Sequence, residues 1–323
     1  MKELLVIEKI KMDFQVRTYL FRSLIVTAVD DVSLTVRQGE TLGIVGESGS
    51  GKTTLGRLSL RLLKPSAGRL LFDGEDITLA DDASLKVFRR RAQGIFQDPF
   101  SSIDPFMNAY QVLEEPLLIH GISNRDGRRE LIYETLEEVR LTPAEEIMTK
   151  YAHALSGGQR QRLAIARALI LRPDYIVADE PVSMIDASSR AEVLYLAREL
   201  QERHGMSFLY ITHDIATARY FSHRIAVMYL GKIVELAPTS RLIGQPRHPY
   251  TQALIGAIPS PDPANRFRER PVIPGEPPSP IHAPSGCRFH PRCPHFIPDK
   301  CEVTEPPMIE VGESHYANCH LYA

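Results

Sequence analysis

The sequence predicts an α/β fold in which a mostly parallel sheet is covered by helices. Two observations favour this class. From residue 41 to residue 236, short apolar runs with strand character alternate with longer stretches of helical apolar spacing. A glycine-rich turn at 46–53 also joins an apolar strand to a helix, as at the carboxyl edge of such a sheet. The chain has 323 residues, 43% of them hydrophobic, which suits one large domain with an appendage or two domains.

The first hundred residues are expected to form a small β region and the start of the parallel sheet. Strands are predicted at 4–10, 32–36, 41–45, 69–72 and 94–97. Helices are predicted at 54–63 and 84–90, the second capped by Ser84. The segment 16–27 shows no clear pattern and is expected to be irregular.

A helical insertion is expected at about 100–170, after which the sheet resumes. The helices predicted in the insertion lie at 108–119, 128–140 and 159–171. The elements predicted after it are strands at 175–178, 207–211, 225–230 and 232–236, with helices at 188–204 and 214–221.

The glycine-rich turn fits the phosphate-loop pattern G-x-x-x-x-G-K-[ST]. Its residues are Gly46, Glu47, Ser48, Gly49, Ser50, Gly51, Lys52 and Thr53, followed by Thr54. Glycines let several backbone N–H groups approach one anion, and a helix N-terminus adds a favourable dipole. We expect Lys52 to reach the β- and γ-phosphates of a nucleotide and Thr53 to bind Mg²⁺. The alternative is a glycine-rich turn that matches the pattern by chance.

Two acids, Asp179 and Glu180, end the apolar strand predicted at 175–178. Parallel strands deliver their terminal carboxylates to the edge of the sheet where the phosphate loop lies. Asp179 is therefore expected to hold Mg²⁺ through water, and Glu180 to act on the attacking water as general base. An acidic turn without function is the alternative, and the phosphate loop upstream weighs against it.

A second candidate phosphate site lies at the start of the helix predicted at 159–171. Its residues are Ser156, Gly157, Gly158 and Gln159, with Ser156 as the helix cap. Because one chain has one γ-phosphate to hold, a second site requires an explanation. The alternative is an ordinary capped helix with a glycine-rich lead-in.

With this Leu-Ser-Gly-Gly-Gln string 20 residues before Asp179, residues 4–240 resemble the ATP-binding subunit of an ABC transporter. The resemblance implies an ABC-type P-loop fold with an antiparallel β subdomain and a helical subdomain. It also implies that two such domains pair head to tail, so that each Ser-Gly-Gly-Gln string caps the ATP held by the other. ATP binding would then close the dimer, and hydrolysis would reopen it.

Further positions match the family residue by residue. Gln97 matches the glutamine that senses Mg²⁺ and the attacking water, Asp186 the aspartate that acts across the dimer, and His213 the switch histidine at the γ-phosphate. Met-Ile replaces the commoner Ala-Leu before Asp186. Phe14 is the candidate aromatic for stacking on adenine, with Tyr19 as its competitor.

A narrower resemblance concerns the region after residue 240. The His-Pro-Tyr-Thr-Gln-Ala string at 248–253, with a Pro-rich tail, resembles the oligopeptide/dipeptide (peptide/nickel) importer branch. That branch implies a second ABC ATPase subunit (a heterodimer, or else a homodimer), two membrane permeases and an extracytoplasmic solute-binding protein. Its solutes are short peptides, with oligosaccharides or nickel in some relatives. The expected domains are 1–240, for nucleotide binding, and 241–323, as a C-terminal extension.

All four cysteines lie in this extension, at Cys287, Cys293, Cys301 and Cys319, and 16 of the 24 prolines lie between Pro246 and Pro307. The spacing lacks the tight C-x₂-C pairs of zinc ribbons. Four thiolates from irregular loops suit a [4Fe–4S] cluster, and members of the branch resemble that arrangement. Zinc is the second choice, and four unligated cysteines are the alternative.

Composition limits the remaining function classes. Lys and Arg total 38 against 40 Asp and Glu, a net charge of −2, so no nucleic-acid partner is expected. No apolar run approaches the ~20 residues of a membrane span, and no signal peptide is recognised. We expect a peripheral protein on the cytoplasmic face of the membrane. A soluble ABC-type ATPase not tied to transport is the rival, weakened by the single phosphate loop and the absence of heptads.

Overall fold

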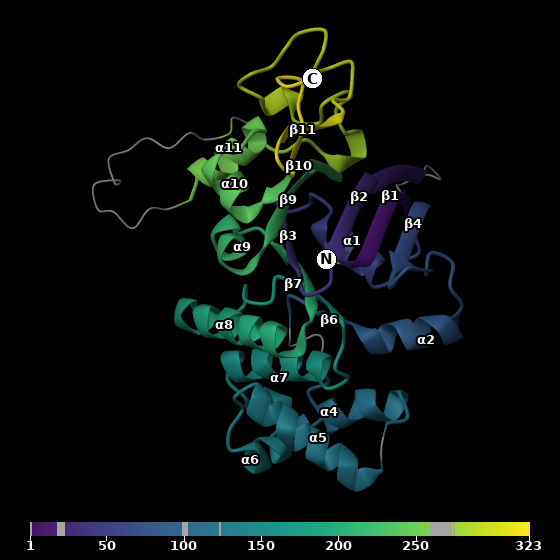
Figure 1. Ribbon diagram of the computed structural model, residues 1–323, viewed down its shortest axis with the longest axis vertical. Coiled ribbons are helices and arrows are strands. Elements are labelled where there is room, and N and C mark those ends of the chain that lie inside the picture. Colours follow the sequence, from purple (N-terminus) through teal and green to yellow (C-terminus); the bar gives the residue numbers. More distant parts are fainter. Residues whose placement is uncertain (1, 18–22, 99–102, 123, 259–272, 274) are drawn as a thin grey trace, which may run out of the picture.

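The computed structural model describes residues 2–17, 23–98, 103–122, 124–258, 273 and 275–323. Two sheets organise this part of the chain, one of four strands and one of eight. A helical subdomain lies at one end of the molecule and the C-terminal region at the other (Figure 1). The sheets and their helical covers agree with the α/β class predicted from the sequence.

The eight-stranded sheet has the order β11-β12-β10-β9-β3-β8-β7-β6. Its parallel part consists of β3 (Thr41–Val45), β6 (Ala92–Ile95), β7 (Tyr175–Asp179), β8 (Ser207–Thr212) and β9 (Arg224–Tyr229). The strands β3, β7 and β8 are buried throughout. Alternate residues of β8 point to the two faces, where Phe208 and Tyr210 join one apolar cluster and Leu209 and Ile211 the other. Burial on both faces explains why these strands read as continuous apolar runs.

The helices that flank this sheet are α1 (Lys52–Ser59), α7 (Gly157–Leu169), α8 (Ala187–His204) and α9 (Ile215–Phe221). Their positions match the predicted helices to within a few residues at each end. The N-terminus of α1 directly follows the glycine-rich turn at the carboxyl end of β3, which places that turn at the edge of the sheet.

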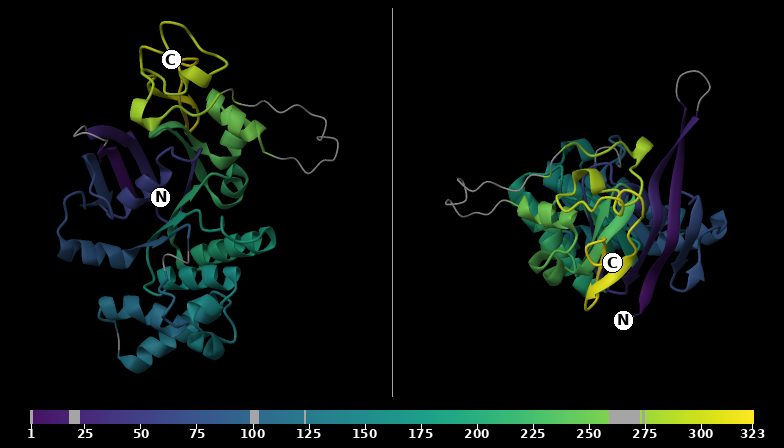
Figure 2. Two further views of the ribbon diagram at one scale, coloured as in Figure 1. Left: turned by 180° about the vertical axis from the view of Figure 1, so that it is seen from behind. Right: turned by 90° about the horizontal axis from the view of Figure 1, so that it is seen from above.

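The four-stranded sheet is antiparallel and has the order β2-β1-β4-β5. Its strands are β1 (Glu3–Arg17), β2 (Ser23–Arg37), β4 (Ala67–Phe72) and β5 (Glu75–Asp76). The prediction of an irregular segment at 16–27 is wrong for residues 16–17 and 23–27, which continue β1 and β2. Their β-branched and aliphatic residues pair along a long hairpin, visible from above in Figure 2.

The helical subdomain contains α4 (Ala109–Ile119), α5 (Arg125–Glu138), α6 (Ala144–Thr149) and the short η1 (Ala152–Ala154), and ends in α7. Asn108 and Gln111 form a capping box at the start of α4. Before this subdomain, α2 (Asp82–Arg91) is capped by Asp81, whose side chain accepts from the Ser84 N–H. Ser84 is therefore not the cap, because the helix begins two residues earlier than predicted.

The C-terminal region joins the larger sheet. Beyond β10 (Lys232–Pro238) it contains α10 (Thr239–Gly244), α11 (Pro249–Gly256), η3 (Pro280–His282), η4 (His290–Arg292), β11 (Met308–Gly312) and β12 (His315–Asn318). The strand β12 pairs with β10, with Glu235 opposite Ala317. The buried Glu235 carboxylate contacts His315 Nε2 at 2.7 Å and accepts from the His248 N–H at 2.8 Å. The sequence did not predict these elements, because prolines obscure the periodicity.

Candidate nucleotide-binding site

Glycine is required at two positions of the phosphate loop. A Cβ on Gly46 would lie 2.1 Å from the Met228 carbonyl oxygen. Gly51 has a φ of 100°, and a Cβ there would lie 2.2 Å from the Ala28 carbonyl oxygen. The loop is therefore packed against β9 and β2 through backbone contacts that no side chain would permit.

The Lys52 ammonium lies inside the curve of the phosphate loop. It donates to the carbonyl oxygens of Gly46 and Glu47 at 2.8 Å each, and its side chain is only 6% exposed. Burial lowers the pKa of Lys52, and the nearby carboxylates of Glu180, Asp179 and Glu47 oppose that shift. A cation held in this position fits the phosphates of a nucleotide.

A pocket of about 260 Å³ opens beside the loop. Three parts of the chain form its walls. They are the phosphate loop with the start of α1, residues 26–28 of β2, and the β9–β10 turn with Pro280 of the C-terminal region. Gln97 and Glu180 complete the lining.

Thr53 and Asp179 meet at the start of α1. Thr53 Oγ1 donates to Asp179 Oδ1 at 3.2 Å, and Asp179 is buried. Burial raises the pKa of Asp179, whereas the Thr53 hydrogen bond and the Lys52 charge lower it. A hydroxyl and a carboxylate placed together are the oxygen ligands that Mg²⁺ prefers, so these residues fit a magnesium ion.

Glu180, Gln97 and His213 come together although they lie far apart in the sequence. The Glu180 carboxylate contacts His213 Nδ1 at 2.8 Å and accepts from Gln97 Nε2 at 3.3 Å. Glu180 has a φ of 48°, an uncommon value for a residue with a side chain, and its N–H donates to the Ile211 carbonyl. The three predicted residues thus form one polar group, of which Gln97 and Glu180 line the pocket.

The Ser-Gly-Gly-Gln string lies at the N-terminus of α7. Ser156 and Gln159 form a capping box, with Gln159 N–H to Ser156 Oγ at 3.3 Å and Ser156 N–H to Gln159 Oε1 at 3.0 Å. In the first turn, Gly157 is exposed near Ile185 and Gly158 is half-buried near Ser189. Among the described residues that line the pocket, none belongs to this string. The string is therefore open to a ligand from outside the chain.

Asp186 caps α8, accepting from the Ser189 N–H at 3.0 Å and from its hydroxyl at 2.9 Å. Phe14 is half-buried and paired with Val26, so it shares the face of the hairpin from which Val26 lines the pocket. Its competitor for adenine, Tyr19, lies outside the described residues.

The four cysteines are free thiols, with Cys301 and Cys319 buried and Cys287 and Cys293 half-buried. Burial, with a smaller contribution from the other thiols, raises the pKa of Cys287 to about 12. In the described part of the chain, no three His, Cys, Asp or Glu side chains are arranged to hold a metal ion. The structure therefore supports neither the expected [4Fe–4S] cluster nor zinc.

The C-terminal region supplies contacts to the phosphate loop that the sequence did not predict. Tyr250 Oη accepts from the Glu47 N–H at 2.8 Å, and Arg292 pairs with the Glu47 carboxylate at 2.9 Å. The string at 248–253 drew attention to Tyr250, but no local pattern indicates a partner some two hundred residues away. Among the described helices, none is both long and apolar enough to cross a bilayer.

This fold and site define a P-loop ATPase with a second, outward-facing helix N-terminus. Comparison with known proteins agrees with this class. Residues 29–183 match the ABC transporter family, and residues 234–301 match the oligopeptide/dipeptide transporter C-terminal region. A putative peptide import ATP-binding protein of Brucella ovis is 48% identical over 301 residues, covering 93% of this chain and 94% of that protein. The chain belongs to the ABC transporter family and hydrolyses ATP as one of its ATPase subunits.

Other relatives extend this likeness over the whole chain and over the fold. Oligopeptide transport ATP-binding protein AppF of Bacillus subtilis is 44% identical over 324 residues, covering 99% of this chain and 98% of that protein. The dimeric, post-hydrolysis structure of the ATP-binding cassette MJ0796 with ADP and phosphate has a TM-score of 0.65 at 30% identity. It covers 73% of this chain and 99% of the cassette. The cbiO1 subunit of Clostridium perfringens, part of an ABC transporter complex, has the same TM-score at 26% identity, covering 76% and 92%.

Proposed function

We propose that this chain energises the import of di- and oligopeptides by binding and hydrolysing ATP at the phosphate loop. The observation that carries the proposal is one pocket lined by Lys52, Thr53, Gln97 and Glu180. Asp179 bonds to Thr53 and His213 contacts Glu180, so both adjoin this lining. The peptide substrate follows from relatives named as peptide importers and from the matching C-terminal region.

In this proposal, the residues of the pocket divide the chemistry among them. Lys52 and the loop N–H groups bind the β- and γ-phosphates, while Thr53 and Asp179 hold Mg²⁺, which neutralises charge that develops on the phosphates. Glu180 orients the attacking water and takes its proton. His213 fixes the Glu180 carboxylate at 2.8 Å, and Gln97 fixes its second oxygen.

The other half of the site comes from a second ATPase subunit. Ser156 to Gln159 form a helix N-terminus that is absent from the described lining of this chain's nucleotide pocket, and such a terminus attracts a phosphate. We propose that it caps the ATP held by the partner, and that Asp186 acts across the same interface. The dimeric state of the similar cassette MJ0796 supports this arrangement. The partner is a different ATPase subunit, with an identical copy as the alternative.

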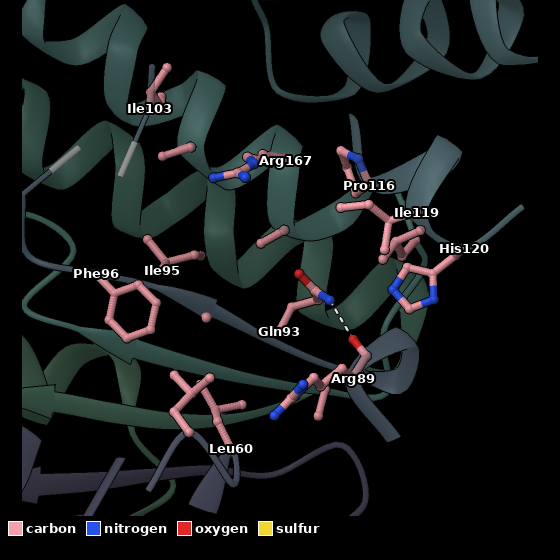
Figure 3. A pocket seen from close by; sticks show the side chains of 16 residues that line it. Leu60, Arg89, Gln93, Ile95, Phe96, Ile103, Pro116, Ile119, His120 and Arg167 are labelled. Atoms are coloured by element: carbon pink, nitrogen blue, oxygen red, sulfur yellow. Dashed lines mark hydrogen bonds between the residues drawn. The ribbon is translucent and has the colours of Figure 1, made fainter. Parts of the chain in front are cut away.

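Two permeases are the proposed membrane partners, bound on the cytoplasmic face. A pocket of about 450 Å³ lies between the helical subdomain and the core (Figure 3). Ile95, Ile103 and Ile119 supply apolar surface there, and Arg89 and Arg167 supply charge. Ile119 is 56% exposed, which suits a surface that a partner covers. Because β6 lines this pocket and ends two residues before Gln97, a permease helix docked here would respond to closure of the dimer.

The experiment that tests the function is uptake by the reconstituted transporter. The subunit is assembled with its permeases, partner ATPase and solute-binding protein, and uptake of labelled di- and oligopeptides is measured with ATP. Uptake that requires ATP and is lost in Lys52→Ala supports the proposal. Uptake of oligosaccharides or nickel instead would support an importer ATPase but contradict the peptide substrate. ATP hydrolysis that the permeases do not affect would favour a soluble ATPase.

A metal at the cysteines is not part of this proposal, because the described cysteines do not form a metal-binding group. The division at residue 240 remains a prediction. The pairing of β12 with β10 shows that the C-terminal extension shares a sheet with the nucleotide-binding part.

A further inference from the structure

The phosphate loop is bound by the C-terminal region at its second residue, Glu47. Tyr250, 203 residues further along the chain, accepts a hydrogen bond from the Glu47 N–H at 2.8 Å. Arg292, 245 residues further along, donates from Nη1 to Glu47 Oε2 at 2.9 Å and from Nη2 to Oε1 at 3.3 Å. Both the backbone and the side chain of Glu47 are therefore fixed from outside the nucleotide-binding part.

These contacts are largely shielded from water on the C-terminal side, while the Glu47 side chain is 27% exposed. The Arg292 side chain is 7% exposed, and Tyr250 is fully buried. Bidentate, charge-assisted hydrogen bonds set direction as well as distance, and their strength rises where water is excluded. Arg292 also donates to Tyr229 Oη at 3.3 Å, which ties the same guanidinium to the end of β9.

An aromatic cluster holds the two C-terminal residues in place. Tyr229 packs against Tyr250 with ring centroids 4.7 Å apart and against Phe289 at 5.3 Å, and Tyr250 and Phe289 lie at 5.4 Å. All three rings are buried. Phe289 directly precedes η4, the short helix that carries Arg292, so the cluster anchors the arginine to the core.

Glu47 also contacts the residue that reaches the phosphates. Its carbonyl oxygen accepts from Lys52 Nζ at 2.8 Å. A shift of Glu47 would therefore move a partner of Lys52 and the N–H groups of the loop. Pro280, which lines the nucleotide pocket, brings a second part of the C-terminal region to the same site.

We propose that Arg292 and Tyr250 are positioning residues of the ATP site, through which the C-terminal region sets the shape of the phosphate loop. The inference rests on the proposed assignment of that loop to ATP. It predicts that the C-terminal region determines nucleotide affinity without touching the reacting atoms.

The test is a double-mutant cycle on the assembled transporter. Arg292→Ala, Glu47→Gln and the double variant are compared with the wild type in KM and kcat for ATP, in affinity for a fluorescent ATP analogue, and in thermal unfolding. Each single variant should raise KM by about tenfold, with a smaller change in kcat, because one partly buried, charge-assisted bidentate pair is lost. The double variant should be no worse than the worse single variant, since both changes break the same pair. Arg292→Lys should restore only part of the affinity, because lysine lacks the planar fork.

The matched control is Arg241→Ala, which removes the Arg241–Glu313 pair on the surface of the same region. Nucleotide affinity should be unchanged in this control. The inference is overturned if Arg292→Ala and Glu47→Gln lower thermal stability but leave KM at the control value, or if their effects on KM multiply in the double variant. Lys52→Ala, measured in the same assay, distinguishes failure of the positioning role from failure of the ATP assignment. Full nucleotide affinity in that variant would contradict the assignment of the phosphate loop to ATP.

Discussion

Glu180 occupies a strained backbone conformation in which both carboxylate oxygens have partners. Its φ of 48° would cost about 1 kcal/mol or more for a non-glycine residue, and the turn after β7 retains it. The conformation lets one carboxylate contact His213 and Gln97 at once. A side chain fixed in this way matches the requirement of a general base that must meet a water in one orientation.

Replacing Glu180 with Gln should separate binding from hydrolysis. Glutamine keeps the size of the side chain but replaces one acceptor oxygen with an NH₂ group and cannot take a proton, so turnover should fall by about 100-fold or more while ATP affinity is kept. Phosphate release and nucleotide titration measure the two effects. Glu192→Gln is the control, since Glu192 is an exposed residue of α8 that pairs with Arg162. Wild-type turnover in Glu180→Gln would show that another group is the base.

Stability below neutral pH should depend on His248. Burial lowers the pKa of His248 to about 4, from an ordinary value of 6.5. Between these two pH values the unfolded chain binds a proton that the folded chain does not, so the free energy of unfolding falls as the pH falls. From pH 6.5 to 5 the loss from this residue is about 2 kcal/mol.

The variant His248→Asn measures this contribution. Nδ1 of His248 accepts from the Tyr250 N–H at the start of α11, and an asparagine oxygen can replace it as a cap. Denaturant unfolding at pH 7 and pH 5 should show a smaller loss in the variant than in the wild type. Equal losses would mean that His248 takes up its proton in the folded state.

At the scale of elements, the sequence predicted those parts whose pattern is local. Buried strands such as β3 and β8 read as apolar runs, and α7 and α8 have caps at Ser156 and Asp186. The family resemblance also predicted that Gln97 and His213 complete the site of Glu180, and the structure brings the three side chains together. The elements that it missed depend on distant partners. The strand β12 forms on β10, and α11 packs on the rings of Tyr229 and Phe289, contacts that no local window contains.

The helix cap Ser156 should have two separable effects. Ser156→Ala removes an N-cap and should lower the free energy of unfolding by about 1 kcal/mol. Asn124→Ala removes the N-cap of α5, far from the proposed interface in sequence, and should cost about the same. Only Ser156→Ala should also weaken ATP-dependent dimer closure, since its hydroxyl is proposed to face the partner's nucleotide. Chemical unfolding and ATPase rates of both variants test this, and equal ATPase rates would reduce Ser156 to a structural cap.

At the scale of the whole molecule, two regions outside the nucleotide pocket are proposed to act on it. The helical subdomain carries the Ser-Gly-Gly-Gln string and one wall of the 450 Å³ pocket, at the end of the molecule away from the C-terminal region (Figure 1). The C-terminal region binds the phosphate loop through the hydrogen bonds of Tyr250 and Arg292 to Glu47. ATP bound between two such chains would connect the string of one to the phosphate loop of the other, and movement of the helical subdomain would reach the permeases.

The most direct measurement is a structure of the assembled transporter containing Glu180→Gln with MgATP. The account predicts a closed ATPase dimer in which Ser156 Oγ and the Gly158 N–H of this chain lie within hydrogen-bond distance of the γ-phosphate on the partner's phosphate loop. A closed, ATP-loaded dimer in which residues 156–159 face solvent or their own chain would contradict it.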